Sequence, residues 1–573
     1  MVKEKKTSAA GNKRRNIFSL LILIAIIILV NFVGSGFFKR FDLTSEKRYT
    51  LAASTRALLN DIEDEVYLKI YLEGDFNPSF ARLKNETREI LDEFRAYSNN
   101  HIQYEFITPG EGLTREEAQN IEKQLYDKGI IPEEVTERKK DKTLQTRIWP
   151  GAIISFKGKE TAWQIFRRQD GINPEQNINN SVEELEYSLT NAIRKLQRDK
   201  KPEVTFIQGH GEIDTLHQYR FMQALSEYYT VNQTVISGKL NGLKGSDAIV
   251  ISQPDSAFDD KDKYIIDQYI MQGGKVLWLI DPMDVNRDSL RKGYTIGINR
   301  PLNIEDMLFK YGVRLNPVLV QDLQCGSIGI NTGFQKGQPK IEVFRWLFSP
   351  VVTTDNAHPI VKNLDAIKFD FLSTLDTISS AKGIKKTILL KTSRYTKTQP
   401  SPVRIALAMV RMQPKESQFI NSYQPVACLL EGEFSSFVEF RIPSRLLNDS
   451  SFKYLDKGKK TKMIIVADGD VARNDFIRNT GEMPPLGYDR YTKMTFANQT
   501  FLLNCVNYLL DDEGMLQLRS REVKLRLLDV KKINLHRTKW QMVNVLVPML
   551  IVIGFAIVQF YLRKRKYSQL KGK

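Results

Sequence analysis

The sequence predicts an α/β protein whose large central part lies between two membrane helices, and three observations lead to this fold class. An uncharged apolar run, Ile17–Val33, lies near the N-terminus, and a second run, Val543–Leu562, lies near the C-terminus. Between them, strand-like apolar runs alternate with stretches of helical apolar spacing, as in sheets that are covered by helices. Because about 500 residues are too many for one hydrophobic core, we expect several domains.

The first apolar run is long enough to cross a bilayer as a helix. Ile17–Val33 spans roughly 26 Å and its continuation to Phe38 roughly 33 Å, against a hydrocarbon core of about 30 Å. A cleaved signal peptide is the alternative, since three basic residues precede the run and small residues follow it. The run is longer than a usual signal core, so we expect an uncleaved transmembrane helix at residues 17–38.

Basic residues lie at the outer end of both runs. Residues 1–16 hold six Lys or Arg and one Glu, and residues 563–573 hold six Lys or Arg, so these tails carry eleven of the seventeen net positive charges. Positive flanks stay in the cytoplasm and are attracted to anionic lipid. We therefore expect a bacterial inner-membrane protein with two helices, both termini cytoplasmic and a periplasmic bulk. The lipid bilayer is then a partner and nucleic acid is not.

Residues 42–198 are predicted to form a thioredoxin-like α/β domain. Its expected elements, in chain order, are the strand Glu65–Leu72, the helix Phe80–Ser98, the strand Ile102–Ile107, the helix Arg115–Lys128, the strands Gly151–Phe156 and Ala162–Phe166, and a helix from Ser181 to Leu196. This βαβαββα order is that of the thioredoxin fold. The domain contains no cysteine, so a redox role is excluded.

Residues 202–510 are predicted to form a doubly wound domain of the Rossmann or flavodoxin type. Its expected elements are the strands Glu203–Ile207, Val231–Ile236, Asp247–Ser252, Lys275–Ile280 and Arg314–Gln321, and the helices Thr215–Tyr229, Asp260–Met271 and Leu302–Lys310. Residues 326–460 lose this alternation and are predicted to be a β-rich insertion. A strand within 461–475 and a helix at Phe496–Leu510 are expected to complete the sheet, and the juxtamembrane segment 511–542 leads into the second membrane helix at 543–562.

A GHGE sequence ends the first strand of the doubly wound domain. Doubly wound sheets bind ligands at the carboxyl ends of their strands, so Gly209, His210, Gly211 and Glu212 form a candidate ligand site. With His217 the imidazole and carboxylate could ligate zinc, but the spacing is not that of a zinc helix. We favour a tight turn supplied by the glycines and a helix cap supplied by Glu212 or Asp214.

Three carboxylates, Asp281, Asp468 and Asp470, are expected at the same edge of the sheet. Together they could hold magnesium or calcium, although carboxylates at these positions also cap the following helix or turn, which we favour. Cys325, Cys428 and Cys505 show neither metal-ligand spacing nor a His partner, and their disulfide pairing is left open. We predict no catalytic residue, no metal and no cofactor.

The chain also lacks nucleotide-binding motifs. There is no G-x-x-x-x-G-K-[ST] and no G-x-G-x-x-G in the sequence. If ATP drives the activity of this protein, another subunit must bind it.

Several stretches, taken in order along the chain, resemble the GldG-type auxiliary proteins of ABC transporters that are associated with bacterial gliding motility. They are DLTSEKRYTL, FIQGHGE, AIVISQP, QGGKVLWLIDP, VACLLEGEFSSF, FANQTFLLNCVNYLL and LRSREVKLRLLD. The resemblance implies a large extracytoplasmic ABC-auxiliary domain related to the GIFT domain of intraflagellar transport proteins. It also implies two partners, a GldF-like permease and a separate GldA-like cytoplasmic ATPase, and no catalytic residues.

The leading hypothesis is therefore a non-enzymatic, membrane-anchored accessory subunit that holds its outer domains over a permease. Polar and small residues of the two membrane helices, namely Asn31, Asn544, Gly554 and Gln559, are candidates for docking to that permease. The alternatives are a tethered glycan- or ligand-binding protein that uses the sheet edge near Gly209–Glu212, and an extracytoplasmic metal-dependent hydrolase. A ligand-binding protein predicts a pocket with convergent polar groups at that edge.

Overall fold

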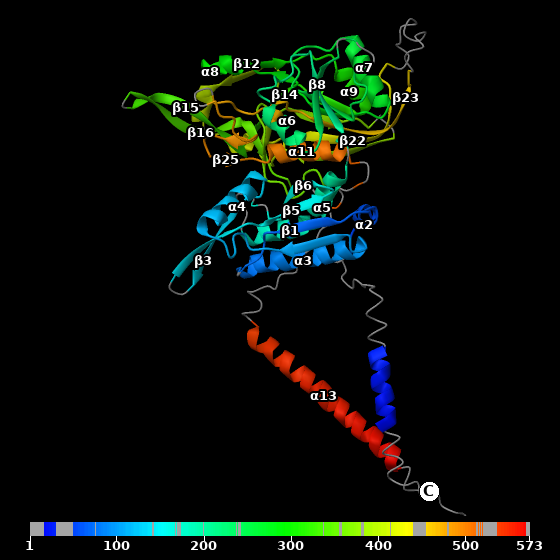
Figure 1. Ribbon diagram of the computed structural model, residues 1–573. Helices are drawn as coiled ribbons and strands as arrows, with labels where there is room; N and C mark the ends of the chain where they lie inside the picture. The colour runs from blue at the N-terminus through cyan, green and yellow to red at the C-terminus, as the bar shows by residue number, and fades with distance from the viewer. Residues whose placement is uncertain are drawn as a thin grey trace, which may run out of the picture. The chain divides into compact units, whose positions relative to one another are not determined.

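The computed structural model divides into two compact units, Met1–Glu522 and Val523–Lys573 (Figure 1). It describes residues 17–29, 50–74, 76–139, 142–166, 168, 174–198, 200–236, 238, 242–335, 337–354, 358–379, 383–412, 414–438, 454–477, 481–511, 514, 516, 518 and 536–568.

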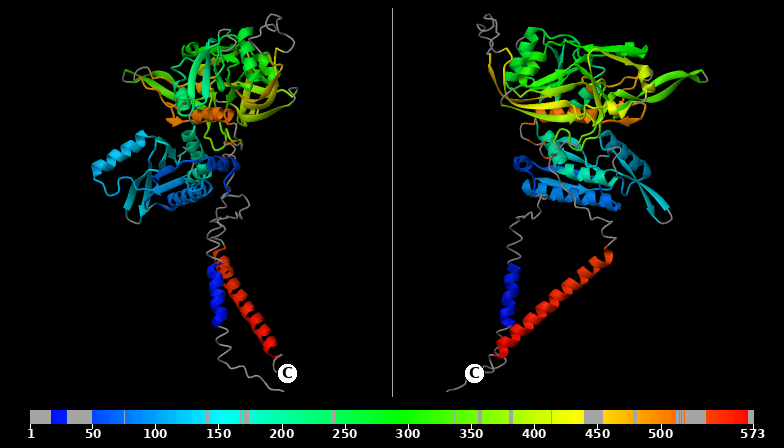
Figure 2. Two further views of the ribbon diagram at one scale, coloured as in Figure 1. Left: turned by 45° about the vertical axis from the view of Figure 1, so that its right-hand side comes forward. Right: turned by 180° about the vertical axis from the view of Figure 1, so that it is seen from behind.

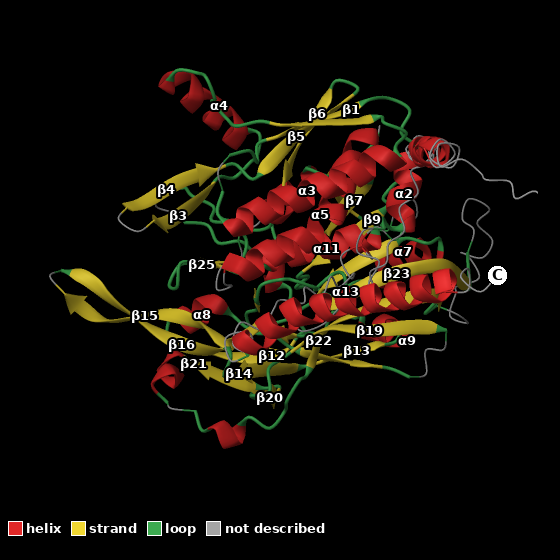
Figure 3. Cartoon of the chain, turned by 90° about the horizontal axis from the view of Figure 1, so that it is seen from below, coloured by secondary structure: helices red, strands yellow, loops and turns green. Residues whose placement is uncertain are grey.

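The first α/β domain contains a four-stranded sheet in the order β2-β1-β5-β6. Its elements are α2 (Ala53–Asn60), β1 (Val66–Ile70), α3 (Pro78–Tyr97), β2 (Ile102–Phe106), α4 (Arg115–Asp127), β5 (Gly151–Phe156), β6 (Lys159–Gln164) and α5 (Pro174–Gln197). Strand β1 runs parallel to β2 and antiparallel to β5, and β5 is antiparallel to β6. Helices α3 and α5 lie side by side (Figure 3). The elements expected from the sequence are thus present, while the thioredoxin-like assignment of the domain stays a prediction.

Local sequence explains how α3 forms. Pro78 is the first helical residue, where its missing N–H is not needed, and the Asn77 side chain accepts a hydrogen bond from the Phe80 N–H at 3.0 Å. Its inward face carries Leu83, Leu91 and Phe94, all with no exposed surface. These side chains pack with the inward residues of β1, which alternates between buried and exposed positions.

Two features of this domain differ from the prediction. A hairpin of β3 (Glu133–Lys139) and β4 (Lys142–Ile148) is present where no strands were expected. Helix α5 begins at Pro174, seven residues before the predicted start at Ser181. Ser181 does not cap the helix, because its hydroxyl lies inside it and donates to the Asn177 carbonyl at 2.9 Å.

The second α/β domain is built on a seven-stranded sheet in the order β19-β22-β23-β10-β9-β7-β8 (Figure 1). The strands are β7 (Glu203–Gln208), β8 (Thr230–Val235), β9 (Ala248–Ser252), β10 (Lys275–Leu279), β19 (Ile384–Lys391), β22 (Pro425–Ser435) and β23 (Lys457–Val466). Strands β8, β7, β9, β10 and β23 are mutually parallel. Their order is that of a doubly wound, flavodoxin-type sheet. All five residues of β9 are buried, as expected for a strand that is covered on both faces.

Helices cover both faces of this sheet. Helices α6 (Tyr219–Ser226) and α11 (Asn498–Leu509) pack on one face through residues such as Phe221 and Phe501. Helices α7 (Asp260–Met271) and α9 (Glu305–Tyr311) pack on the other face through residues such as Ile266 and Met307. The last predicted strand and helix complete the sheet as expected, because β23 pairs with β10 and α11 packs beside it.

The predicted helix Thr215–Tyr229 is shorter than expected. Residues 215–218 form turns ahead of α6, because the Asp214 side chain accepts the His217 N–H at 2.9 Å and closes a local loop.

The predicted boundary of the β-rich insertion is wrong in two respects. Strands β19 and β22 lie inside the proposed insertion of residues 326–460, yet they extend the main sheet as antiparallel strands next to β23. Conversely, the predicted strand Arg314–Gln321 does not join that sheet. It is interrupted at Pro317, which has no N–H to donate, and becomes β13 (Val313–Asn316) and β14 (Val318–Asp322).

Smaller sheets and short helices lie outside the main sheet. They contain β11 (Met283–Asp284), β12 (Tyr294–Asn299), β15 (Cys325–Gln335), β16 (Gln338–Val352), β17 (Ile367–Lys368), β18 (Thr374–Thr377), β20 (Thr396–Pro400), β21 (Val403–Ala406), β24 (Tyr488–Asp489) and β25 (Met494–Thr495), with the short helices α8 (Arg287–Arg291), η1 (Leu407–Arg411), η2 (Glu416–Gln418) and η3 (Asp470–Ala472). Strand β13 pairs with β18 and β14 with β20, while β15 and β16 form a long ribbon (Figure 2).

The second unit contains α13 (Arg537–Ser568). Within its segment Arg537–Arg565, an 18-residue window has a mean hydropathy of 2.5, and among the helices of the described residues this is the one long and apolar enough to cross a membrane. The N-terminal helix Ile17–Leu29 is apolar but shorter, and residues 30–38 of the predicted first span, with Asn31, lie outside the described residues. The expected pair of membrane helices is therefore supported for the C-terminal run and stays a prediction for the N-terminal one.

Candidate functional site

The GHGE turn lies where the winding of the main sheet changes direction. The chain proceeds from β7 outward to β8 and then returns to β9 on the other side of β7, so β7 and β9 flank the topological switch point. Gly209 and Gly211 follow β7 with φ angles of 120° and 71°. These values lie in the region that glycine adopts without strain, as the turn interpretation requires.

His210 is held in the centre of a hydrogen-bonded cluster. Its Nδ1 lies 3.1 Å from an oxygen of Glu212, and its Nε2 lies 3.1 Å from an oxygen of Asp262 on α7. The His210 N–H also donates to Glu212 at 2.7 Å. Burial lowers the pKa of the imidazole, but hydrogen bonds and charge from the two carboxylates outweigh it and raise the pKa above its usual value. The turn is thereby fastened to α7.

The loop after β9 packs against the GHGE turn at the switch point. The His210 carbonyl accepts hydrogen bonds from the N–H groups of Asp255 and Ser256, both at 2.9 Å. The His210 ring stacks on Phe258 with its centroid 3.7 Å away. The polar groups that a ligand would need at this turn are thus engaged within the protein. His217 takes no part in the cluster, since its Nδ1 lies 2.7 Å from Asp214.

The three predicted aspartates do come together at the sheet edge. Asp281 follows β10, and Asp468 and Asp470 follow β23. One oxygen of Asp281 accepts the Gly469 N–H at 2.5 Å, and the other accepts the Gln253 side-chain amide at 2.6 Å. The same Gln253 amide donates to Asp470 at 2.8 Å. Gln253, at the end of β9, therefore links the two carboxylates.

Asp468 links the acidic cluster to the backbone at Val471 and at Asp370. Its oxygens accept the N–H groups of Val471 at 2.8 Å and of Asp370 at 3.0 Å. Arg287 of α8 lies 2.6 Å from an oxygen of Asp470 and 3.5 Å from one of Asp370. Two carboxylates thus pair with the Arg287 guanidinium, whose charge also acts on Asp468 and balances part of the negative charge.

Burial and mutual repulsion shift the pKa values of these acids. Burial first, and then the charge of Asp470, raise the pKa of Asp281 to about 6 against the opposing hydrogen bonds from Gly469 and Gln253. The pKa of Asp468, which has no exposed surface, is raised well above its usual value by burial and by the charges of the neighbouring aspartates. Folding thus makes the carboxyl groups of Asp281 and Asp468 harder to ionise.

These hydrogen bonds, ion pairs and raised pKa values fit a role in stabilising the loops at the sheet edge better than a role in metal binding. Asp468 closes a local turn, because its carboxylate accepts the N–H of Val471 in η3, three residues ahead of it, at 2.8 Å. Within the described part of the chain, no group of three or more His, Cys, Asp or Glu side chains has an arrangement that could hold a metal ion. Arg287 supplies the positive charge that faces these carboxylates.

Several residues of these clusters were not predicted. Gln253 directly follows the buried strand β9, so its place at the sheet edge could have been found from the sequence, unlike its role as a link. Asp262, Arg287 and Asp370 lie on separate elements, and nothing in their local sequence marks them. The sequence did not mark Gly469 as part of the cluster either. Only glycine fits at this position, because a Cβ there would lie 2.5 Å from the Gln253 Cβ.

An open cavity of about 790 Å³ lies beside the acidic cluster, at the end of β10. It is lined by Ile280 and Pro282, which flank Asp281, together with Arg300 and the half-exposed Phe309. Arg300 is already engaged, because its guanidinium lies 2.7 Å from Asp284. The cavity therefore offers mainly an apolar wall.

The fold defines a class of protein, an α/β protein whose largest domain is doubly wound and whose described residues include one helix long and apolar enough to cross a membrane. A family model described as an ABC-type uncharacterized transport system, of the ABC-transporter auxiliary kind, matches residues 201–505, more than half of the chain. The chain therefore belongs to this family of ABC-transporter auxiliary proteins. The predicted membership is confirmed at this level, while the narrower GldG-type assignment stays a prediction.

Other comparisons extend the match without adding a function. A second model, described as a domain of unknown function, matches residues 45–155. An uncharacterized protein of Borreliella burgdorferi is 21% identical over 568 residues, which cover 97% of this chain and 99% of the relative. The chain also has a low similarity, with a TM-score of 0.29 and 10% sequence identity, to a solved structure titled "mmIFT52 N-terminal domain". The match covers 55% of this chain and 97% of that structure.

Proposed function

We propose that this protein is a membrane-anchored, non-enzymatic accessory subunit of an ABC transporter. The observation that carries the proposal is the family match over residues 201–505, which contains the whole seven-stranded sheet. The apolar helix α13 supports a place in the membrane. Since the sequence holds no P-loop, ATP would be bound by a separate subunit.

The proposed topology has two anchors. The run at residues 17–38 and α13 would both span the inner membrane with their basic ends inside, and both α/β domains would lie outside. Two helices cannot enclose a transport path, so a polytopic permease is needed. On the GldG-type resemblance, that permease is GldF-like, the ATPase is GldA-like, and the complex serves gliding motility.

One side of α13 suits docking to the permease. At 100° per residue, Asn544, Gly554 and Gln559 fall within roughly 140° of the helix circumference. Helices in a bilayer pack through small residues and interhelical hydrogen bonds, which this side offers. On the N-terminal anchor, Asn31 is the corresponding polar residue.

Affinity purification of the tagged full chain from native membranes tests the proposal. We expect a permease and an ATPase of the ABC type to co-purify with the wild-type protein. A triple variant, Asn544→Leu, Gly554→Leu and Gln559→Leu, should lose at least tenfold of the permease. The matched control replaces Leu546, Ile553 and Phe560 by Ala on the opposite side of the helix and should keep the partner.

The two possible failures are distinct. If the triple variant retains the permease as well as the wild type does, the docking surface is wrong while the accessory role stands. If the wild-type chain brings down neither a permease nor an ATPase, the accessory role itself is wrong.

A further inference from the structure

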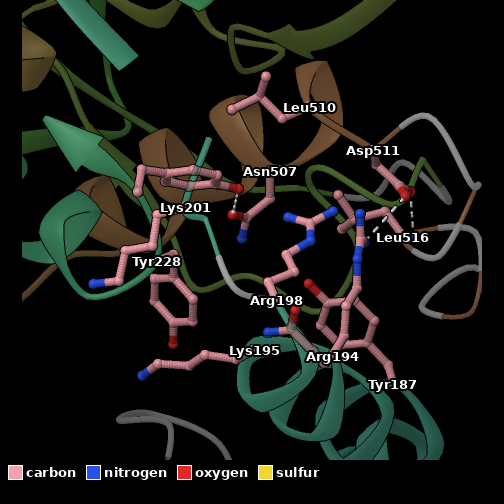
Figure 4. A pocket seen from close by; sticks show the side chains of 12 residues that line it. Tyr187, Arg194, Lys195, Arg198, Lys201, Tyr228, Asn507, Leu510, Asp511 and Leu516 are labelled. Atoms are coloured by element: carbon pink, nitrogen blue, oxygen red, sulfur yellow. Dashed lines mark hydrogen bonds and ion pairs between the residues drawn. The ribbon is translucent and has the colours of Figure 1, made fainter. Parts of the chain in front are cut away.

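A small cavity of about 50 Å³ lies where the two α/β domains of the first unit meet (Figure 4). Its walls come from the C-terminal end of α5, from the turn between α6 and β8, and from the end of α11. A buried water needs about 10–15 Å³ of such space. The cavity can therefore hold a few waters or one small polyatomic ion.

The walls of this cavity are strongly basic. Arg194, Lys195, Arg198 and Lys201 line it, and Asp511 is the acidic residue among its lining side chains. Arg194 lies 3.6 Å from Asp511, so that pair is internally balanced. Burial lowers the pKa of Lys195, the charge of Glu227 opposes this effect, and the charge of Lys201 adds to it. Positive charge is thus concentrated in a partly desolvated place.

The basic side chains are held in position by their neighbours. The Lys195 ammonium lies 4.9 Å from the centroid of the Tyr228 ring. The Lys201 ammonium donates to the Ser226 carbonyl at 2.8 Å. Cations near a helix C-terminus also interact with the helix dipole, which accounts for Arg194 and Lys195 in the last turn of α5. It does not account for Lys201, which comes after the helix and approaches from the side of α6.

A larger cavity of about 580 Å³ adjoins the basic one. The two share Tyr187, Asn191, Lys195, Tyr228 and Asn507 in their walls. Beyond these residues, the larger cavity is lined by aromatic and amide side chains such as Trp163 and Gln164 and by the carboxylates Glu133, Glu184 and Glu227, which can accept hydrogen bonds from hydroxyl groups. A ligand with a compact anionic group and a larger polar body would fit this combination.

We propose that the basic cavity binds a phosphate-type oxyanion that belongs to a polar, hydroxyl-bearing molecule lying in the adjoining groove. Arginine and lysine side chains supply charge-assisted hydrogen bonds to phosphate oxygens. The amide of Asn507 lies opposite the α5 cations (Figure 4) and adds a neutral donor. Because the walls come from both domains, an occupant would contact both of them. The phosphate group can belong to a sugar or to a lipid head group, and the experiment separates these sources.

Binding is measured by calorimetry on the purified full chain in detergent at constant ionic strength. The probes are inorganic phosphate, glucose 6-phosphate, glycerol 1-phosphate and glucose. We expect phosphate-bearing probes to bind and glucose alone not to bind. A higher affinity for glucose 6-phosphate identifies a sugar phosphate as the ligand class, and a higher affinity for glycerol 1-phosphate identifies a lipid head group.

Three variants decide whether the site is the one described. The double variant Arg198→Gln with Lys201→Gln should bind at least tenfold more weakly. In the wild type, the Tyr229 hydroxyl donates a hydrogen bond to the Asn507 side-chain oxygen at 2.6 Å. Asn507→Asp keeps an acceptor for this bond but adds a negative charge, so it should also abolish binding. Lys200→Gln is the matched control, since Lys200 is exposed, neighbours Lys201 and does not line the cavity. An unchanged thermal midpoint without ligand confirms that the variants fold.

The proposal is overturned if no phosphate-bearing probe binds, if the double variant binds as the wild type does, or if Lys200→Gln weakens binding equally. Because the measurement uses the chain without its partners, its failure leaves the accessory role untouched.

Discussion

Asp281 and Asp468 show how neighbouring residues decide the charge of a buried carboxyl group. Both accept two hydrogen bonds, which favour the ionised form, yet burial and the adjacent aspartates prevail. The side chain of Gln253 and the guanidinium of Arg287 keep the cluster together despite this repulsion. A carboxyl group whose pKa is raised by folding stabilises the native state when it is protonated.

The stability of the first unit should therefore fall as pH rises. The usual pKa of aspartate is about 3.9, and in the folded chain that of Asp281 is about 6. The contribution of Asp281 is fully present below pH 4 and is lost as pH rises through 6, because the unfolded chain releases its proton first. The loss is on the order of 3 kcal/mol. Thermal or urea unfolding followed by tryptophan fluorescence between pH 3.5 and pH 7.5 measures it.

Asp281→Asn tests the assignment of this pH dependence. The amide cannot ionise, so the slope with pH should become smaller. The variant should be less stable by about 1–2 kcal/mol at pH 5, since an amide group replaces an acceptor of two hydrogen bonds. Asp475→Asn, at an exposed ion pair with Arg490, is the control and should keep the wild-type slope. An unchanged slope in Asp281→Asn would contradict the assignment.

At the scale of elements, β22 and α11 show how strands and helices from distant parts of the chain build one core. Strand β22 lies between β19 and β23, and its residues 426–430 are all buried. Helix α11 packs on the opposite face of the sheet from the residues that surround Cys428. Cys428 of β22 and Cys505 of α11 are thus buried in different core clusters, and neither forms a disulfide.

The reactivity of the Cys428 and Cys505 thiols shows whether β22 and α11 are packed in the core. Burial raises the pKa of Cys428 to about 12 and that of Cys505 well above its usual value, so neither forms a thiolate at neutral pH. Maleimide labelling of the native chain, read by mass spectrometry, should modify Cys325 alone, and slowly, because burial raises its pKa as well. In denaturant all three should react.

The control for this labelling is Cys325→Ser, which should leave the native chain unmodified. Rapid native labelling of Cys428 or Cys505 would show that β22 or α11 is not packed as described.

At the scale of the whole molecule, the apolar helices and the basic tails decide where the domains work. The apolar run of α13, residues 543–562, is followed within the same helix by four basic residues, Arg563 to Lys566. The positive end of such a helix stays in the cytoplasm. The proposed role over a permease requires the α/β domains to lie on the other side.

Cysteine accessibility tests this topology. In a Cys325→Ser background, Lys340→Cys on the exposed part of β16 should react with a membrane-impermeant maleimide in cells whose outer membrane has been permeabilised. Lys564→Cys, at the basic end of α13, should react only after detergent opens the inner membrane. Labelling of Lys564→Cys in intact inner membranes would reverse the proposed orientation, and Lys340→Cys controls for reagent access.

The sequence by itself determined the features that depend on local periodicity and composition. Strands β9, β10 and β23 were predicted from their apolar runs, whereas polar residues interrupt the sequence of β8, which lies at the edge of the sheet. Helix α7 was predicted with its observed bounds, and Gly273 ends its apolar pattern. The apolar run of α13 and its basic end were also predicted from the sequence. The convergence of Asp281, Asp468 and Asp470 followed from a general rule, since parallel strands end at one edge.

Only the tertiary structure decided which distant residues meet. Strands β19 and β22 look like an insertion in the sequence because antiparallel pairing to β23 leaves no local mark. His210 was a candidate ligand until Asp262, on α7 of the same domain, was found against its ring. The basic cavity combines α5 of one domain with α11 of the other, more than 300 residues later. Such pairings depend on how the elements pack against one another. Periodicity along the chain reports local structure only, and it does not indicate contacts between segments that are far apart in the sequence.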